Sequence, residues 1–169
     1  MKKGTVYWIT GLSNSGKTTL SVRLVAHLKE LGIAAVHLDG DALRSVYGDA
    51  PDFSAATRNK VAFRNARLCA LLSEQGISVV CSTISLFHDV QKWNRQNISS
   101  YKEIYLRAPL AVRQARDVRG IYSGQNVAGT DFAVEEPKNP ELALDNDGSL
   151  SMDELFEKVR GLVQVPLPV

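Results

Sequence analysis

The chain has 169 residues, of which 44% are hydrophobic and 22% charged, and its net charge is +2. This length suits one domain with a proper core, and we expect a single domain over residues 1–169. So small a net charge, without a basic stripe or clustered aromatic residues, argues against a nucleic-acid-binding protein.

Two further properties narrow the class of protein. Lys2 and Lys3 precede only a short apolar run, and no stretch of the sequence is apolar for long enough to cross a bilayer. We therefore expect a cytoplasmic protein without a signal peptide or membrane contact. Cys69 and Cys81 stand in apolar surroundings without the spacing of a metal site, so we expect buried, reduced thiols.

Apolar and β-branched runs alternate along the chain with segments of helical periodicity. The runs predict strands at residues 6–9, 33–38, 77–81, 102–107 and 142–145. The helical segments are residues 19–31, 42–46, 54–75, 89–98, a helix starting at Pro109, and residues 151–163. Such alternation predicts an α/β three-layer sandwich, with a parallel sheet of about five strands and helices on both faces.

Between the first strand and the first helix lies a phosphate-binding pattern of Gly, four residues, Gly, Lys and Thr. Its members are Gly11, Leu12, Ser13, Asn14, Ser15, Gly16, Lys17 and Thr18. Backbone N–H groups in such a turn point inward, and the following helix adds its N-terminal dipole. Lys17 would reach the β- and γ-phosphates of a nucleoside triphosphate, and Thr18 would ligate Mg²⁺.

Polar side chains also follow the second and third predicted strands. Asp39 and Asp41 come after the second strand, and Ser82 and Ser85 come after the third. In isolation Asp-Gly-Asp is most simply a polar turn. Because the carboxyl ends of parallel strands converge on one crevice, however, the two carboxylates suit Mg²⁺ coordination or activation of an attacking hydroxyl.

Residues 117–140 show no periodicity and contain several glycines and prolines. This length is unusual for a connection without structure, so we expect a mobile, functional lid. Residues 163–169 are apolar for an exposed end, and we expect them to pack on the domain or on a partner.

The sequence resembles the adenylylsulfate (APS) kinase family over nearly its whole length. The shared landmarks are Trp8 to Ser13, Leu38 to Asp41 with Arg44, Phe53 and Ser54 with Arg58, Ile84 and Ser85 with Phe87, Arg116 and Asp117 with Gly120 and Tyr122, and Asn139 to Glu141. The resemblance implies a P-loop kinase fold and a dimer. It also implies transfer of the γ-phosphate of MgATP to the ribose 3′-hydroxyl of adenosine 5′-phosphosulfate.

The resemblance assigns roles to individual residues. Asp41 matches the carboxylate near the acceptor hydroxyl, which acts as a base or as a Mg²⁺ ligand beside Thr18. Asp39 would assist Asp41 in this role. Ser85 matches a serine described as phosphorylated, but in a direct in-line transfer it only hydrogen-bonds the substrate. The implied catalytic residues are Lys17, Asp39, Asp41 and Ser85. The implied ATP-binding residues are Gly11 to Thr19, Arg113 and Arg116. The implied acceptor-binding residues are Asp41, Arg44, Phe53, Arg58, Ile84, Ser85 and Arg119.

Departures from the family pattern concentrate in the acceptor pocket. Val61 stands where the family usually has Asn, Thr83 to Leu86 replace Phe-Ile-Ser-Pro, and Val127 replaces one of two rings that sandwich the adenine. The lost ring would weaken binding by roughly 1–3 kcal/mol and the lost amide by roughly 0.5–1.5 kcal/mol. These departures suggest that the acceptor is not APS but a related nucleotide with a small group on its 5′-phosphate chain and a smaller base. The resemblance to cytidine diphosphoramidate kinases of capsular polysaccharide modification implies cytidine diphosphoramidate as the alternative to APS.

Three other functions are compatible with a phosphate loop. A GTPase switch would need the guanine-reading Asn-Lys-x-Asp, which the sequence lacks. A simple ATPase would hydrolyse ATP without stimulation by an acceptor. A catalytically inactive nucleotide-binding or scaffold protein need not keep Lys17, Thr18, Asp39 and Asp41, all of which are present.

Overall fold

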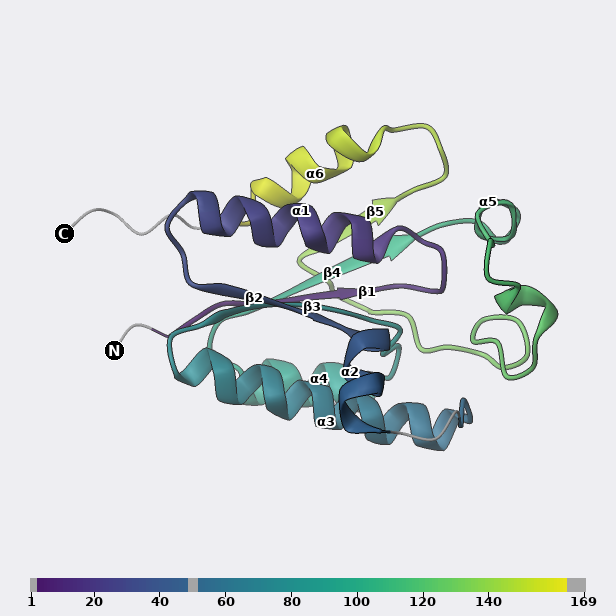
Figure 1. Cartoon of the computed structure of the whole chain (residues 1–169), viewed down its shortest axis with the longest axis horizontal. Coiled ribbons are helices and arrows are strands. Elements are labelled where there is room, and N and C mark those ends of the chain that lie inside the picture. The colour runs from purple at the N-terminus through teal and green to yellow at the C-terminus, as the bar shows by residue number, and fades with distance from the viewer. Residues whose placement is uncertain (1–2, 49–51, 164–169) are drawn as a thin grey trace.

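The computed structural model describes residues 3–48 and 52–163. Its centre is a five-stranded sheet in the order β2-β3-β1-β4-β5, with every pairing parallel (Figure 1). The strands are β1 (Val6–Thr10), β2 (Ala35–Asp39), β3 (Ser78–Thr83), β4 (Tyr101–Arg107) and β5 (Leu142–Asp145). The predicted parallel α/β sheet is thus confirmed.

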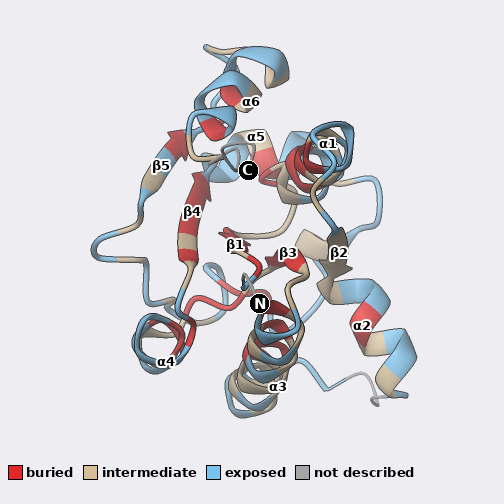
Figure 2. Ribbon diagram, turned by 90° about the vertical axis from the view of Figure 1, so that its left-hand side faces the viewer, coloured by how far each residue is buried: buried red, intermediate tan, exposed pale blue. Residues whose placement is uncertain are grey.

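Helices cover both faces of the sheet (Figures 1 and 2). The helices α1 (Lys17–Glu30) and α6 (Met152–Arg160) pack on one face, and α3 (Ala55–Glu74) and α4 (His88–Asn97) pack on the other. Two shorter helices, α2 (Gly40–Tyr47) and α5 (Leu110–Ala115), follow β2 and β4 at the carboxyl end of the sheet.

Alternation along β1 divides the core into two clusters. Tyr7 and Ile9 pack towards α1 and α6, whereas Val6 and Trp8 pack towards α3 and α4. All five residues of β1 are buried, because the strand has a neighbour on each side and helices above and below. The sheet is therefore a rigid base for the loops at its carboxyl edge.

Most element boundaries differ from the predictions by one to three residues, and two of these differences concern the ends of α1 and α6. The second strand begins at Ala35, two residues later than predicted, because the amides of Gly32 and Ile33 close the end of α1 on the carbonyls of Lys29 and Leu28. The last helix ends at Arg160 and continues only as a turn to Val163. Its predicted capping box is confirmed between Ser151 and Glu154.

The predicted lid, residues 117–140, is irregular apart from a 3₁₀ turn at Ile121–Ser123 and a bridge between Ala128 and Phe132. It is anchored on α4, where the Glu135 carbonyl accepts a hydrogen bond from Gln91. Most of the apolar tail lies outside the described residues. Within them, no helix is both long and apolar enough to span a bilayer, and Cys69 and Cys81 are buried and free, as expected.

Candidate active site

The phosphate loop joins β1 to α1 in a backbone conformation that needs glycine. Gly11 has φ 152° and Gly16 has φ 99°. A Cβ on Gly11 would lie 2.3 Å from the carbonyl oxygen of Leu106, and one on Gly16 would lie 2.7 Å from Nδ2 of Asn146. The loop is thus pressed against the carboxyl ends of β4 and β5, with the N-terminus of α1 directly behind it.

Lys17 lies within the loop that it completes. Its Nζ donates to the carbonyl oxygen of Leu12 at 2.7 Å. Burial lowers the pKa of the Lys17 ammonium to about 8, although the carboxylates of Asp39 and Asp41 act in the opposite direction. The Lys17 ammonium thus lies against the backbone of the phosphate loop, at short range from any phosphate bound there.

Asp39 is the carboxylate that contacts the phosphate loop. Its Oδ2 accepts hydrogen bonds from Thr18 at 3.1 Å and Ser82 at 3.0 Å, and its Oδ1 accepts from the amides of Asp41 and Ala42 at the start of α2. Burial alone would raise the pKa of Asp39, but these hydrogen bonds outweigh it and hold the pKa below its usual value. The carboxylate is consequently ionised at neutral pH.

Asp41 pairs with the lid in this structure. Its Oδ2 lies 2.8 Å from Nη1 of Arg119 on the lid, and both side chains are exposed. The sequence analysis paired Asp41 with Thr18 as Mg²⁺ ligands, and this assignment stays a prediction. In the structure it is Asp39 that accepts a hydrogen bond from Thr18. Oδ1 of Asp39 caps α2, which fixes its side chain towards the loop and leaves Asp41 in the first turn of the helix, turned towards the lid.

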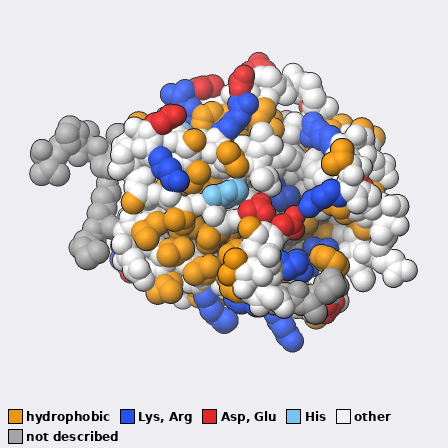
Figure 3. Space-filling model, in the orientation of Figure 1, with side chains coloured by type: hydrophobic (Ala, Val, Ile, Leu, Met, Phe, Trp, Pro, Cys, Tyr) orange, Lys and Arg blue, Asp and Glu red, His pale blue; other side chains and the backbone are white. Residues whose placement is uncertain are grey.

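One cavity of about 720 Å³ joins the phosphate loop to the space between α3 and the lid. Figure 3 shows acidic and basic side chains mixed around the hollow in the right half of that face. Most predicted site residues line the cavity: Ser13, Asn14, Gly16, Lys17, Thr18, Thr19, Asp39, Asp41, Arg44, Phe53, Arg58, Ile84, Ser85, Arg116 and Arg119. Of the remainder, Gly11, Leu12 and Ser15 belong to the loop but do not line the cavity.

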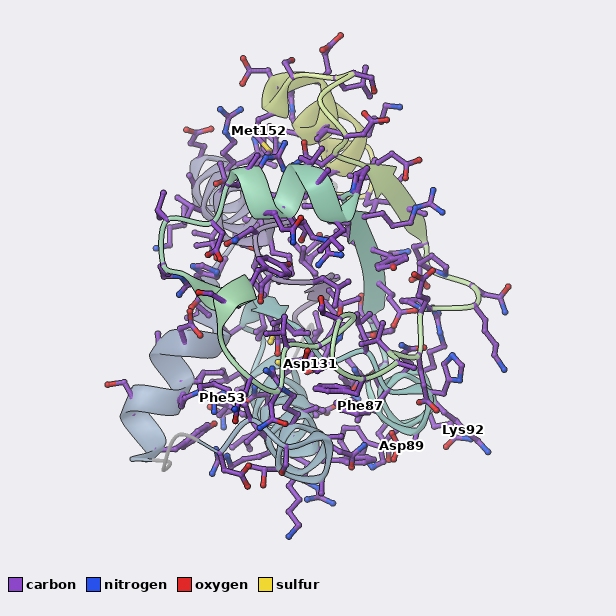
Figure 4. All side chains as sticks on the ribbon, turned by 90° about the vertical axis from the view of Figure 1, so that its right-hand side faces the viewer. Phe53, Phe87, Asp89, Lys92, Asp131 and Met152 are labelled. Atoms are coloured by element: carbon purple, nitrogen blue, oxygen red, sulfur yellow. The ribbon has the colours of Figure 1, made fainter. Side chains whose placement is uncertain are left out.

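One end of the cavity combines an aromatic ring with two cations. The guanidinium carbons of Arg44 and Arg58 lie 4.7 Å and 5.3 Å from the ring centroid of Phe53. Arg58 also donates to the carbonyl oxygens of Phe53 and of Asn126 on the lid. In the view of Figure 4, Phe53 and Phe87 lie at the edge of the lid, with Asp131 between them. This end suits an anionic ligand that carries a flat ring.

Ser85 lies deep in the cavity wall after β3. Its side chain is only 4% exposed, and its hydroxyl lies 3.0 Å from the hydroxyl of Thr83. The buried, hydrogen-bonded hydroxyl is suited to orienting a ligand from the side, as the direct-transfer interpretation expects. The role of Ser85 stays a prediction.

Arg113 is placed differently from the prediction. It is 5% exposed, and its guanidinium donates to the carbonyl of Ala108 and to the hydroxyl of Tyr122. Tyr122 in turn donates to the carbonyl of Ser13 in the phosphate loop at 2.9 Å. Arg113 therefore supports the loop through Tyr122 and does not line the cavity.

Sequence reasoning missed Asn146 and Asn65. Asn146 follows β5, and its side chain donates to the carbonyl of Ser15 at 2.9 Å and accepts from Arg116 at 3.2 Å. The rule that located Asp39, a polar residue directly after a strand, would also have located Asn146. Asn65 lines the cavity from the middle of α3, where nothing in the helical pattern singles it out.

The chain is similar to known proteins in sequence and in structure. The family model for adenylylsulphate kinase matches residues 3–145. A probable adenylyl-sulfate kinase of Pyrococcus abyssi is 34% identical over 166 residues, covering 93% of each chain. A cytidine diphosphoramidate kinase of Campylobacter jejuni is 31% identical over 160 residues, covering 91% of this chain and 93% of that protein.

A solved structure extends the likeness to the whole fold. The Mycobacterium tuberculosis APS kinase CysC, in complex with AMPPNP and APS, superposes with a TM-score of 0.87 at 30% identity. The match covers 96% of this chain and 98% of that one. The similarity therefore includes the sheet, the loop and the lid together.

Proposed function

This chain belongs to the adenylylsulphate kinase family, and we propose that its acceptor is a nucleotide with a small anionic group on its 5′-phosphate. As a member of that family it is an ATP-dependent phosphotransferase acting on a hydroxyl group. The proposed acceptor atom is the ribose 3′-hydroxyl. The observation that carries the proposal is the single cavity that connects the phosphate loop with the Arg44, Phe53 and Arg58 group.

The donor half of the cavity suits MgATP. The Lys17 ammonium would neutralise charge on the β- and γ-phosphates. The hydroxyl of Thr18 and the carboxylate of Asp39 place two oxygen atoms 3.1 Å apart beside the loop, and hard oxygen ligands are those that Mg²⁺ prefers. These two residues would hold the ion, which supplies further neutralisation of phosphate charge when bound.

The acceptor half suits an anionic nucleotide. Arg44 and Arg58 offer two guanidinium groups to a 5′-phosphate chain, and the 38% exposed ring of Phe53 offers a stacking face to the base. Asp41 lines the same cavity and would accept the proton of the attacking hydroxyl once released from Arg119. Positioning and charge neutralisation then supply most of the rate enhancement.

Between APS and cytidine diphosphoramidate as the acceptor, we favour the second. The lid contributes the aliphatic Val127, only 5% exposed, to the cavity wall, so a base there meets a smaller apolar surface than an aromatic ring provides. A single-ring base needs less stacking area than a double-ring base. The relative from Campylobacter jejuni bears the name of a kinase for this acceptor.

An acceptor screen tests the proposal. The protein is incubated with MgATP and each nucleotide, ADP release is followed, and phosphorus NMR locates the new phosphate. We expect a 3′-phosphorylated product and a higher kcat/KM for cytidine diphosphoramidate than for APS. A far higher kcat/KM for APS would refute the pyrimidine preference, and ATP binding without any phosphorylated product would instead support an inactive nucleotide-binding protein.

A further inference from the structure

Asn65 is a buried amide without a partner at the wall of the cavity. The residue is fully buried in α3 and lines the cavity. Within residues 3–48 and 52–163, neither Nδ2 nor Oδ1 has a hydrogen-bond partner. An amide in this state is costly, because it has lost its hydrogen bonds to water without replacing them. A partner that enters the cavity would remove this cost.

The surroundings of Asn65 give no other reason for a polar side chain. On the same side of α3, Ala62, Ala66 and Cys69 pack in the apolar cluster against the sheet. A leucine of similar size would fill such a position without an unpaired group. The Asn65 amide is therefore a polar group among apolar residues on this side of α3.

The position of Asn65 indicates which part of the acceptor it meets. Arg58, Val61 and Asn65 recur at helical spacing and all line the cavity, and Asn65 lies about 10 Å further along the axis of α3 than Arg58. Phe53, which offers the stacking face for the base, is at the more exposed end. A 5′ chain that passes Arg58 thus brings its terminal group to the buried end, at Asn65.

An amide offers one donor group and one acceptor oxygen, so its best partner also offers both. A terminal sulfate has only acceptor oxygens and would leave Oδ1 facing a negative charge. A terminal phosphoramidate has an N–H donor for Oδ1 and an oxygen acceptor for Nδ2. We propose that Asn65 hydrogen-bonds the terminal group of the acceptor's 5′ chain and selects an amidated phosphate over a fully anionic group.

This inference rests on the proposed function and deepens it. In the structure both amide atoms are closed to water. The amide becomes available when other residues that line the cavity move aside for the ligand. Because the contact is equal in the ground state and the transition state, it acts on KM rather than on kcat.

The test compares acceptors that differ only in the terminal group. The wild-type protein and Asn65→Leu are assayed with cytidine diphosphoramidate and with cytidine diphosphate, which has oxygen in place of the amide nitrogen. We expect the wild type to prefer the phosphoramidate by about 10-fold in kcat/KM, and Asn65→Leu to reduce this preference to about 2-fold or less. The KM for ATP should stay unchanged.

Two further variants make the result decisive. Asn65→Ser, smaller and polar, replaces the leucine variant if thermal melting shows that the latter does not fold. Asn59→Leu is the matched control, because Asn59 lies on the same helix, binds Asp89 and does not line the cavity. Equal loss with both acceptors, or no preference in the wild type, would overturn the inference. No phosphorylation of any nucleotide would instead overturn the proposed function.

Discussion

Asp39 both caps α2 and contacts the phosphate loop, and two substitutions can separate these roles. Its Oδ1 caps α2 through the amides of Asp41 and Ala42, and its Oδ2 accepts from Thr18 and Ser82 at the phosphate loop. Asp39→Asn keeps an oxygen for the cap but removes the negative charge. Asp39→Ala removes both.

The expected effects on stability follow from the hydrogen bonds. Asn and Asp are comparable N-caps, so Asp39→Asn should change the free energy of unfolding by less than about 1 kcal/mol. Asp39→Ala loses the cap and the acceptor of two hydroxyls, although Ser82 keeps its contact with His37 at 2.9 Å. A loss of about 1–3 kcal/mol, or about 3–9 °C in Tm, is expected.

The expected effects on activity are the same for both variants. Without the carboxylate the phosphate loop loses the negative charge next to Thr18, and kcat/KM should fall by about 10–100-fold. Raising the Mg²⁺ concentration should restore part of the lost ATP binding.

Steady-state ADP release with the acceptor found in the screen, repeated over a series of Mg²⁺ concentrations, measures these effects beside thermal melts. Asp52→Asn is the matched control, because Asp52 is also a carboxylate that accepts hydrogen bonds at the start of a helix, but it does not line the cavity. Wild-type activity and an unchanged Mg²⁺ dependence in Asp39→Asn would show that Asp39 is only a helix cap.

Three further predictions concern the donor site and the core. Because the pKa of Lys17 is lowered to about 8 and phosphates bind the protonated form, kcat/KM for ATP should fall as pH rises through 8, by up to about tenfold per pH unit; a flat profile from pH 7 to 9 would contradict this. Tyr122→Phe removes the hydroxyl that donates to Ser13 and should raise the Kd for ATP by about 2–10-fold, measured by calorimetry; an unchanged Kd would mean that the loop needs no such support. Arg95→Ala leaves the buried Glu103 carboxylate without its ion pair at 2.8 Å and should cost about 2–3 kcal/mol in urea unfolding, discounted because Arg95 is over a third exposed; a loss below about 0.5 kcal/mol would show that the pair is fully screened.

Much of the site could be predicted because its determinants are local in the chain. The phosphate loop is a continuous run between a strand and a helix, and its glycines lie where the backbone takes positive φ values. Asp39 could be located because a parallel sheet brings all its carboxyl ends to one edge. The homodimer, the lid motion and the role of Ser85 stay predictions.

One could therefore predict from the amino-acid order the succession of elements, the fold class and the donor side of the cavity. The tertiary structure alone decided that Asp39 rather than Asp41 contacts Thr18, that Arg113 contacts Tyr122 and does not line the cavity, and that Asn65 faces the cavity. The physical reason is that these side chains are directed by packing between elements far apart in the chain, such as α3 against the sheet. Spacing along the sequence predicts which residues share one face of a helix or strand. Which residues that face contacts depends on the elements packed against it.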